Sequence, residues 1–216
     1  MKSLSRQTLI IIGLVVVVAA AAVYFLFLRQ GGSLNSVDME ELLVPGPLGE
    51  MALGDPNAPV TVVEYASMTC SHCAAFHQTV YEPFKEKYID TGKVRFILRE
   101  YPLDPLAKAA IIVARCGGVM RFFPTVDLLF EQQRGWATAA NQVEAMYSLV
   151  RQTGISRQQF DTCLADQKML DGVNWVHSRA ATEFGVQSTP TFFVDGERHP
   201  GAMTLDEISA LIDPKL

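Results

Sequence analysis

Positive charge is scarce in this sequence. Of 216 residues, 18 are Lys or Arg and 23 are Asp or Glu, which gives a net charge of −5. A chain with this balance has no basic surface field with which to hold nucleic acid. Internal repeats and low-complexity tracts are also lacking. These absences leave one domain of ordinary size, with an appendage, as the expected organisation.

The appendage is an uncharged apolar run from Thr8 to Leu28. As a helix it would be about 30 Å long, which matches the hydrocarbon core of a bilayer. Lys2 and Arg6 precede it, and this charge predicts that the N-terminus stays in the cytoplasm while the rest is exported. We therefore expect a cytoplasmic stub and transmembrane anchor over residues 1–29 and a tether over residues 30–50.

A cleaved signal peptide is the alternative interpretation of the same run. The alanines at 19–22 favour it, whereas the apolar residues that continue from Tyr24 to Leu28 favour an uncleaved anchor. In both cases the globular part lies outside the cytoplasm, where disulfides persist. The four cysteines of the chain permit two pairs there.

The exported part begins with a strand–helix–strand pattern. PVTVVEY, from Pro59 to Tyr65, predicts a central strand, and KVRFILR, from Lys93 to Arg99, predicts a second one. Between them we predict a helix from Cys70 to about Tyr88, with Ser67 and Thr69 as candidate caps. This order favours a parallel strand pair and an α/β domain over residues 51–216.

A helical block over about residues 104–181 follows, and a strand, a hairpin turn and a final helix close the chain. The predicted helices of the block are Ala107 to Cys116, Thr125 to Gln133, Asn141 to Gln152, one that starts at Ser156, and Lys168 to Phe184. TFFV, from Thr191 to Val194, predicts the strand, and Asp195-Gly196 predicts a turn into a short strand. Leu205 to Ile212 predicts the last helix.

The chemistry of the chain is concentrated in Cys70 and Cys73, which flank Ser71 and His72. A helix that starts at this point offers free N–H groups and a favourable dipole, so Cys70 is expected to ionise more readily than a free thiol. His72 can add positive charge or a hydrogen bond to the thiolate. Cys73, one turn into the helix, would be the less exposed partner that closes a disulfide.

A metal site and a static disulfide are the alternatives for this pair. Cys70, Cys73 and His77 could supply three ligands, but no second closely spaced cysteine pair exists to complete a structural zinc site. We therefore expect no metal and no other cofactor. A pair that exchanges electrons remains the preferred interpretation.

Glu64 lies within the apolar strand, six residues before Cys70. A buried carboxylate is costly unless it is paired or has a chemical role, which makes Glu64 a candidate proton relay for Cys73. The alternative is that Glu64 points to solvent at a sheet edge.

The other two cysteines, Cys116 and Cys163, both fall in the helical block. If Cys70 pairs with Cys73, these two can pair with each other and add about 2–4 kcal/mol by closing the loop between them. The alternative is two free buried thiols. Pro190, just before the strand TFFV, is unremarkable by itself, since a proline is tolerated at the first residue of a strand.

Taken together, PVTVVEYASMTCSHCAAFH and the later VQSTPTFFVDG resemble the DsbA-like branch of the thioredoxin superfamily. The lead-in GDPNAP, from Gly54 to Pro59, and the stretches ARCGG, DLLFEQQ and GAMTLDEI are similar to its membrane-anchored bacterial members. The likeness extends from about Leu53 to Ile212. It implies a thioredoxin fold with an inserted helical subdomain, and a periplasmic domain held by a single-pass anchor in the inner membrane or released as a soluble periplasmic protein.

The resemblance also implies roles for individual residues. Cys70 would be the attacking cysteine, Cys73 its buried partner and Glu64 the buried acid. Pro190 would be a cis-proline beside the cysteines, and the backbone of Thr189 would pair with substrate. Ser71 and Thr189 depart from the proline and valine that are common in the strongest oxidants of the family, and both positions tune redox potential and partner choice.

The function implied is a thiol-disulfide oxidoreductase of exported proteins. We expect an oxidase that accepts electrons from cysteine-containing polypeptides and is reoxidised by a membrane redox partner. Its reduction potential should lie between that of thioredoxin, about −270 mV, and that of DsbA, about −120 mV. The alternatives are a reductase or isomerase of the same compartment, or a non-catalytic binding module with this fold.

Overall fold

The computed structural model describes residues 35–216, and Val37 to Leu216 form one compact unit. No helix within residues 35–216 is long and apolar enough to cross a membrane. The anchor or signal peptide predicted over residues 1–29 lies outside the described residues.

The unit is built on a mixed sheet of five strands. Their order is β1-β3-β2-β4-β5, so β2 is central, as predicted. The strands are β1 (Ala52–Leu53), β2 (Val60–Ala66), β3 (Val94–Glu100), β4 (Thr191–Val194) and β5 (Glu197–Pro200). The predicted parallel pairing of β2 with β3 is confirmed, while the other neighbours in the sheet run antiparallel.

Alternation along β2 divides the core into two layers. Val60, Val62 and Ala66 face one apolar cluster, whereas Val63 and Tyr65 face the other. Glu64 has the parity of the first set, so its side chain enters the layer beneath the helix that carries the cysteines. The charge is therefore inside the protein and not at an edge of the sheet.

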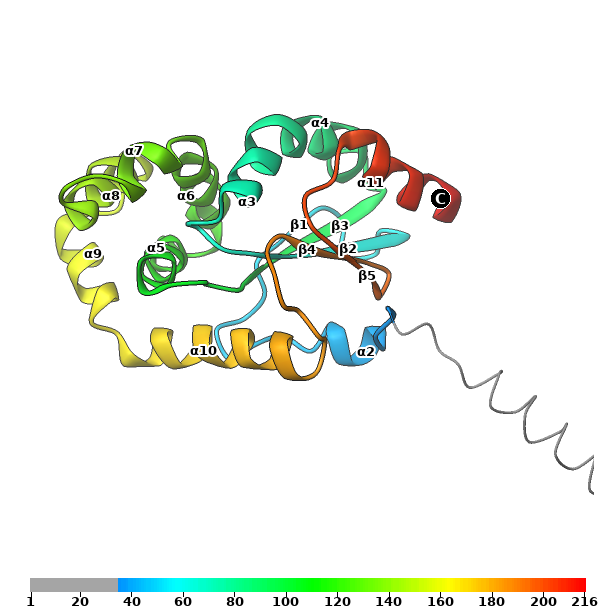
Figure 1. Ribbon diagram of the computed structural model, residues 1–216, viewed down its shortest axis with the longest axis horizontal. Helices are drawn as coiled ribbons and strands as arrows, with labels where there is room; N and C mark the ends of the chain where they lie inside the picture. Colours follow the sequence, from blue (N-terminus) through cyan, green and yellow to red (C-terminus); the bar gives the residue numbers. More distant parts are fainter. Residues whose placement is uncertain (1–34) are drawn as a thin grey trace, which may run out of the picture. The chain divides into compact units, whose positions relative to one another are not determined.

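Helices cover both faces of the sheet (Figure 1). The predicted helix after β2 is one helical run from Ser71 to Ile89 that contains two wider π turns. Its segments are α3 (Ser71–Phe76), the π turn η1 (His77–Tyr81), α4 (Glu82–Phe84) and the π turn η2 (Lys85–Ile89). This run and α11 (Leu205–Ile212) lie on one face, and α10 (Gln167–Thr182) lies on the other.

The helical block comes between β3 and β4 in sequence, and apart from α10 it stands at one end of the sheet. It consists of α5 (Pro105–Cys116), α6 (Val119–Glu131), α7 (Gln133–Ala137), α8 (Gln142–Val150), the short turn η3 (Arg151–Thr153), α9 (Arg157–Leu164) and α10. The mixed α/β fold with an inserted helical subdomain is thus confirmed. The predicted start of α6 at Thr125 is wrong, because the helix continues through Pro124 and begins at Val119. Phe122 and Phe123 are both buried, and their packing outweighs the bond lost at the proline.

The segment before β1 differs from the tether predicted over residues 30–50. Residues from Val37 onward belong to the compact unit, and the short helix α2 (Met39–Leu42) places Leu42 at 0% exposure in the second core cluster. Arg99 donates hydrogen bonds to the carbonyls of Leu42 and Val44, and Arg115 to those of Leu48 and Gly49. Buried arginines thus hold the segment before β1 through its backbone carbonyls. Hydrophobic periodicity in the sequence gives no sign of contacts of this kind.

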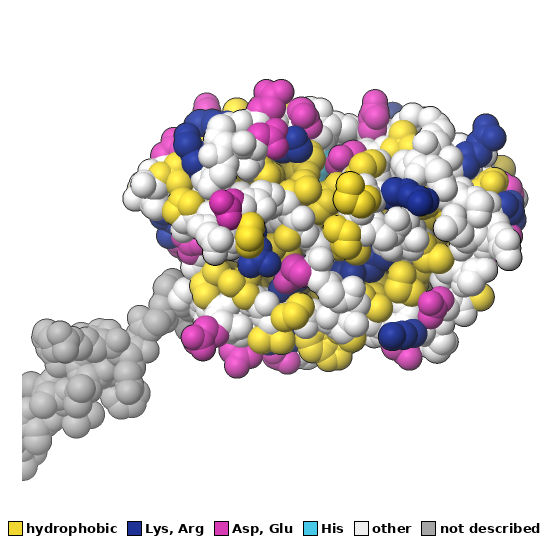
Figure 2. Space-filling view, turned by 180° about the vertical axis from the view of Figure 1, so that it is seen from behind, with side chains coloured by type: hydrophobic (Ala, Val, Ile, Leu, Met, Phe, Trp, Pro, Cys, Tyr) yellow, Lys and Arg dark blue, Asp and Glu magenta, His cyan; other side chains and the backbone are white. Residues whose placement is uncertain are grey.

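The surface agrees with the charge balance of the sequence. Figure 2 shows Lys and Arg side chains scattered among acidic and apolar ones on one face, without a contiguous basic area.

The last helix, α11, has the bounds predicted for it and is followed by a short turn, η4 (Asp213–Lys215). Its Thr204 and Glu207 form a capping box, which explains why its start could be read from sequence.

Candidate active site

Cys70 occupies the N-cap position of α3, after a short segment that follows the end of β2 at Ala66. The predicted capping by Ser67 or Thr69 is wrong, because no side chain caps this helix. The hydroxyl of Ser67 instead accepts from the backbone of Leu103, and Thr69 donates to Asp104 at 2.5 Å. The first N–H groups of α3 therefore remain available to the sulfur of Cys70.

The two cysteines are free thiols in very different surroundings: Cys70 is half-buried, whereas Cys73 is fully buried. A hydrogen bond from the Cys73 thiol, helped by the backbone N–H groups of Cys73 and His72 and opposed by burial, lowers the pKa of Cys70 to about 5. Burial, the hydrogen bond to Cys70 and the charge of Glu64 raise the pKa of Cys73 far above its ordinary value. Near neutral pH the pair therefore holds one thiolate, on Cys70, and one proton, on Cys73.

His72 and the residues around Pro190 complete the surface at Cys70. The His72 side chain is exposed, and the backbone N–H of His72 donates to the thiolate. The Thr189–Pro190 peptide bond is cis, and the carbonyl oxygen of Thr189 lies 3.2 Å from Cys70 Sγ. A cavity of about 150 Å³ is lined by neighbours of this loop, among them Gln187 and Ser188. The two predicted motifs, distant in sequence, thus meet at one sulfur.

Glu64 is 0% exposed and bonds to His77, with 3.0 Å between Glu64 Oε2 and His77 Nε2. His77 follows Cys73 by four residues, so the two side chains project from the same side of the helical run. The His77 ring is stacked on Phe130 at 4.4 Å and lies 4.7 Å from the ring of Tyr81. These contacts fix the imidazole on the carboxylate.

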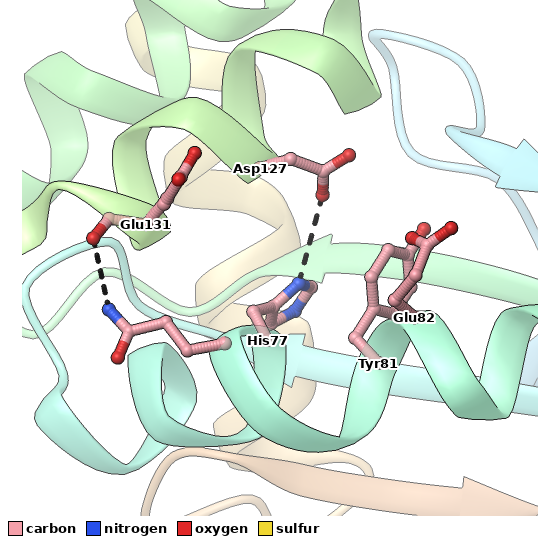
Figure 3. Close-up of a pocket in the computed structure, with 6 residues that line it drawn as sticks. His77, Tyr81, Glu82, Asp127 and Glu131 are labelled. Atoms are coloured by element: carbon pink, nitrogen blue, oxygen red, sulfur yellow. Dashed lines mark hydrogen bonds and ion pairs between the residues drawn. The ribbon is translucent and has the colours of Figure 1, made fainter.

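A cavity of about 550 Å³ lies beyond His77 (Figure 3). His77, Gln78, Tyr81, Glu82, Asp127 and Glu131 line it. His77 Nδ1 points toward Asp127 Oδ1 at 4.0 Å, and neither atom has a hydrogen-bond partner. Burial, opposed by His77, raises the pKa of Asp127 to about 6. The Asp127 side chain is 47% exposed, so it joins the buried ring to the open part of the cavity.

The helical subdomain also reaches the active-site loop through Gln133. Its side-chain amide donates to the carbonyls of Met68 and Cys70, each at 2.9 Å. In the opposite direction, Gln78 donates to the carbonyls of Phe130 and Glu131. These reciprocal amide bonds tie the segment before Cys70 and the helix after it to the junction of α6 and α7.

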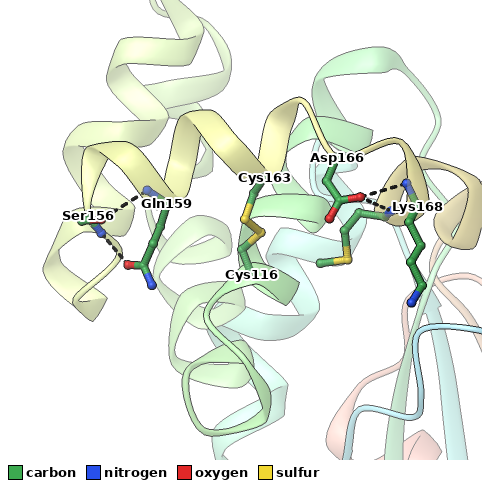
Figure 4. Close-up of a disulfide and its surroundings, with 7 residues drawn as sticks. Cys116, Ser156, Gln159, Cys163, Asp166 and Lys168 are labelled. Atoms are coloured by element: carbon green, nitrogen blue, oxygen red, sulfur yellow. Dashed lines mark hydrogen bonds between the residues drawn. A yellow bond between two sulfur atoms is a disulfide. The ribbon is translucent and has the colours of Figure 1, made fainter.

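Cys116, at the end of α5, and Cys163, in α9, form a disulfide with a Cα–Cα distance of 6.1 Å (Figure 4). It joins two helices of the block. The helix that carries Cys163 begins with a capping box formed by Ser156 and Gln159, which is also drawn in Figure 4.

Sequence reasoning missed the relations among His77, Asp127 and Gln133. The sequence suggests His77 only as a third metal ligand, and no group of three or more potential metal ligands occurs within residues 35–216. Its spacing of four from Cys73 was the available signal for its true position. For Asp127 and Gln133 no local signal exists, since both reach the site from the inserted subdomain.

Comparison with known proteins agrees with this geometry. Residues 48–214 match the family model described as Thioredoxin. Over 82% of this chain and 95% of the other, the fold superposes on Wolbachia pipientis alpha-DsbA1 with a TM-score of 0.75 and 30% identity. This chain is a DsbA-like member of the thioredoxin superfamily.

Two further proteins define the extent of the likeness. A Rickettsia felis protein named as a candidate protein-disulfide oxidoreductase is 33% identical over 168 residues, which is 77% of this chain. The match spans only 60% of that relative's length. BdbD from Bacillus subtilis shares the fold, with a TM-score of 0.70 at 20% identity over 84% of this chain and 96% of that one.

Proposed function

We propose that this DsbA-like chain is a thiol-disulfide oxidoreductase that oxidises the cysteines of exported proteins. The observation that carries the proposal is the unequal pair: Cys70, with its pKa lowered to about 5, and Cys73, with a raised pKa, at an uncapped helix start beside a cis-proline. The names of relatives in Rickettsia and Wolbachia support the same chemistry.

In this reaction a substrate thiolate attacks Cys70 Sγ of the Cys70–Cys73 disulfide. A substrate–Cys70 disulfide forms, the Cys70–Cys73 bond breaks, and Cys73 leaves as a thiolate that must take up one proton. The second substrate thiolate then attacks the substrate sulfur of the mixed disulfide and releases Cys70 as a stable thiolate. The substrate gains a disulfide, and the enzyme gains two electrons and one proton.

The direction of electron transfer, from substrate to enzyme, follows from the stability of the Cys70 thiolate. A pKa of about 5 in place of 9.0 favours the reduced enzyme at neutral pH by about 2 kcal/mol, after allowance for solvent screening at a half-buried sulfur. For a two-electron couple this raises the reduction potential by about 40 mV. A more stable reduced form is a more oxidising enzyme, so the site favours an oxidase over a reductase or isomerase.

We assign substrate recognition to the loop at Thr189 and Pro190. An extended polypeptide that contains cysteine can approach the backbone of this loop beside Cys70. Exposed His72 lies where it can influence the incoming thiolate. A membrane redox partner would return the pair to the disulfide, and a periplasmic location, anchored or free, is the compartment in which such a cycle runs.

An equilibrium titration of the Cys70–Cys73 pair against reduced and oxidised glutathione tests the direction. We expect a potential between about −270 mV and about −120 mV. A value near that of thioredoxin would favour the reductase instead. A non-catalytic binding module would be indicated if Cys70→Ala left the activity of the protein in its host unchanged.

A further inference from the structure

The proton on Cys73 poses a problem that the cysteines cannot solve by themselves. Cys73 must accept a proton when the substrate attacks Cys70, and it must lose that proton when the enzyme is reoxidised. Its side chain has 0% exposure, so bulk water does not reach the sulfur. Glu64, also at 0% exposure, acts on Cys73 through its charge but has no direct access to solvent either.

Glu64 has two oxygens in different situations. Oε2 is bonded to His77 Nε2 at 3.0 Å, whereas Oε1 is buried without a partner. Since Cys73 and His77 project from the same side of one helical run, the carboxylate can serve both of them. Oε1 has no partner and is free to exchange a proton, and Oε2 is already joined to the imidazole.

His77 continues the connection away from the cysteines. Its Nδ1 atom has no partner and lies 4.0 Å from Asp127 Oδ1, and both residues line the cavity of about 550 Å³. A small movement of the half-exposed Asp127 side chain would close this distance to a hydrogen bond. The imidazole can accept a proton on one nitrogen while it donates a proton from the other. An amide side chain in the same place could hydrogen-bond to Glu64 but could not pass a proton on in this way.

We propose that Glu64, His77 and Asp127 form a proton path from the buried Cys73 to the cavity lined by Tyr81, Glu82 and Glu131. This inference rests on the proposed redox function and identifies His77 and Asp127 as positioning residues that act through Glu64. During substrate oxidation one proton moves inward along the path to the Cys73 thiolate. During reoxidation the Cys73 thiol loses one proton outward along it.

Several side chains surround His77 and Asp127 and influence the protonation of these two residues. Glu64 approaches His77 from β2, Tyr81 and Glu82 from η1 and α4, Asp127 and Glu131 from α6, and Lys85 acts on Asp127 from η2. Of the carboxylates on the cavity side, only Asp127 lies within ion-pair distance of the His77 ring among the residues described, 35–216. Glu131 offers a matched control, because it is another carboxyl side chain in the lining of the same cavity.

The test follows the reaction of the reduced full-length protein with oxidised glutathione. Cys70 first forms a mixed disulfide with glutathione. Cys73 then loses its proton, attacks Cys70 Sγ and releases the glutathione thiolate. Rapid acid quenching and mass spectrometry resolve the two steps over a range of pH.

We expect His77→Gln, which keeps a hydrogen-bond donor toward Glu64, to leave the first step unchanged and to slow the second about 100-fold. Asp127→Asn should slow the second step less and alter its pH profile, whereas Glu131→Gln should behave as the wild type. In His77→Ala, free imidazole that enters the cavity should restore the second step. Pyrazole, a ring of the same size that takes no proton near neutral pH, should not.

A second step in both His77→Gln and Asp127→Asn that is as fast as in Glu131→Gln at every pH would overturn the path. If His77→Gln fails to fold, Asp127→Asn at the rim of the cavity decides the matter by the same criterion. A wild-type chain that forms no mixed disulfide at all would instead overturn the proposed function, and the path with it.

Discussion

The hydrogen bond between the two active-site thiols can be tested by removing its donor. It is the largest cause of the low pKa of Cys70, about 5, while the backbone N–H groups of His72 and Cys73 make further contributions. Cys73→Ala removes the thiol donor and keeps those N–H groups. A hydrogen bond to a charged group is worth about 1.5–3 kcal/mol, so the variant should raise the pKa of Cys70 to about 6 or 7.

Cys73→Ser is the matched control, because its hydroxyl retains a donor at the same position. Its Cys70 should titrate close to the wild-type value of about 5. The assay is the ultraviolet absorbance of the thiolate as a function of pH, checked by the rate of alkylation with iodoacetamide. If Cys73→Ala and Cys73→Ser titrate alike, the Cys73 thiol is not the donor, and the helix start and Thr189 would have to stabilise the thiolate.

Three further predictions concern stability. The lowered pKa of Cys70 means that the thiolate stabilises the folded reduced protein fully above pH 9, and that this contribution is lost as the pH falls to about 5. Because Cys70 does not titrate in the disulfide, denaturant unfolding should show the reduced form losing stability relative to the oxidised form as the pH drops over this range. Replacing both Cys116 and Cys163 by Ala opens a loop with a sequence separation of 47 and should lower the free energy of unfolding by up to about 4 kcal/mol, with the alkylation rate of Cys70 unchanged; an altered rate would show that the disulfide acts on the active site. Gln133→Ala removes two hydrogen bonds and should destabilise the protein by about 1–3 kcal/mol and speed amide exchange around Cys70, whereas the exposed neighbour Gln132→Ala should do neither.

The sequence predicted those elements in which a local pattern coincides with the packing. β2 and β4 are apolar and β-branched or aromatic and lie in the middle of the sheet, and the observed bounds of β4 and α11 are those predicted. The pairing of β2 with β3 followed from the intervening helix. Patterns of this kind are local, and tertiary contacts reinforce them here.

The predictions were wrong where distant residues decide the local structure. Ser67 and Thr69 have the chemistry of cap residues, but Leu103 and Asp104, which follow the neighbouring strand, engage their hydroxyls instead. The segment before β1 lacks periodicity and was expected to be a tether, yet three buried arginines hold part of it, since Arg179 also donates to the carbonyls of Glu41 and Val44. The local sequence of a segment does not show the contacts that it makes with side chains from distant parts of the chain.

The redox motif likewise gives only half of the site. Cys70, with a pKa of about 5, needs no proton near neutral pH, whereas Cys73 must take up or lose one in every cycle. The environment that separates the two pKa values, a solvent-facing helix start for one sulfur and complete burial for the other, is also what cuts Cys73 off from water. A lower pKa of Cys70 makes the pair a stronger oxidant, whereas complete burial of Cys73 makes it depend on an internal proton donor. The proposed path would meet that requirement through the carboxylate of Glu64, which is joined to His77 at 3.0 Å. On that proposal, the chemistry of this site depends on β2 and the inserted subdomain as much as on the two cysteines.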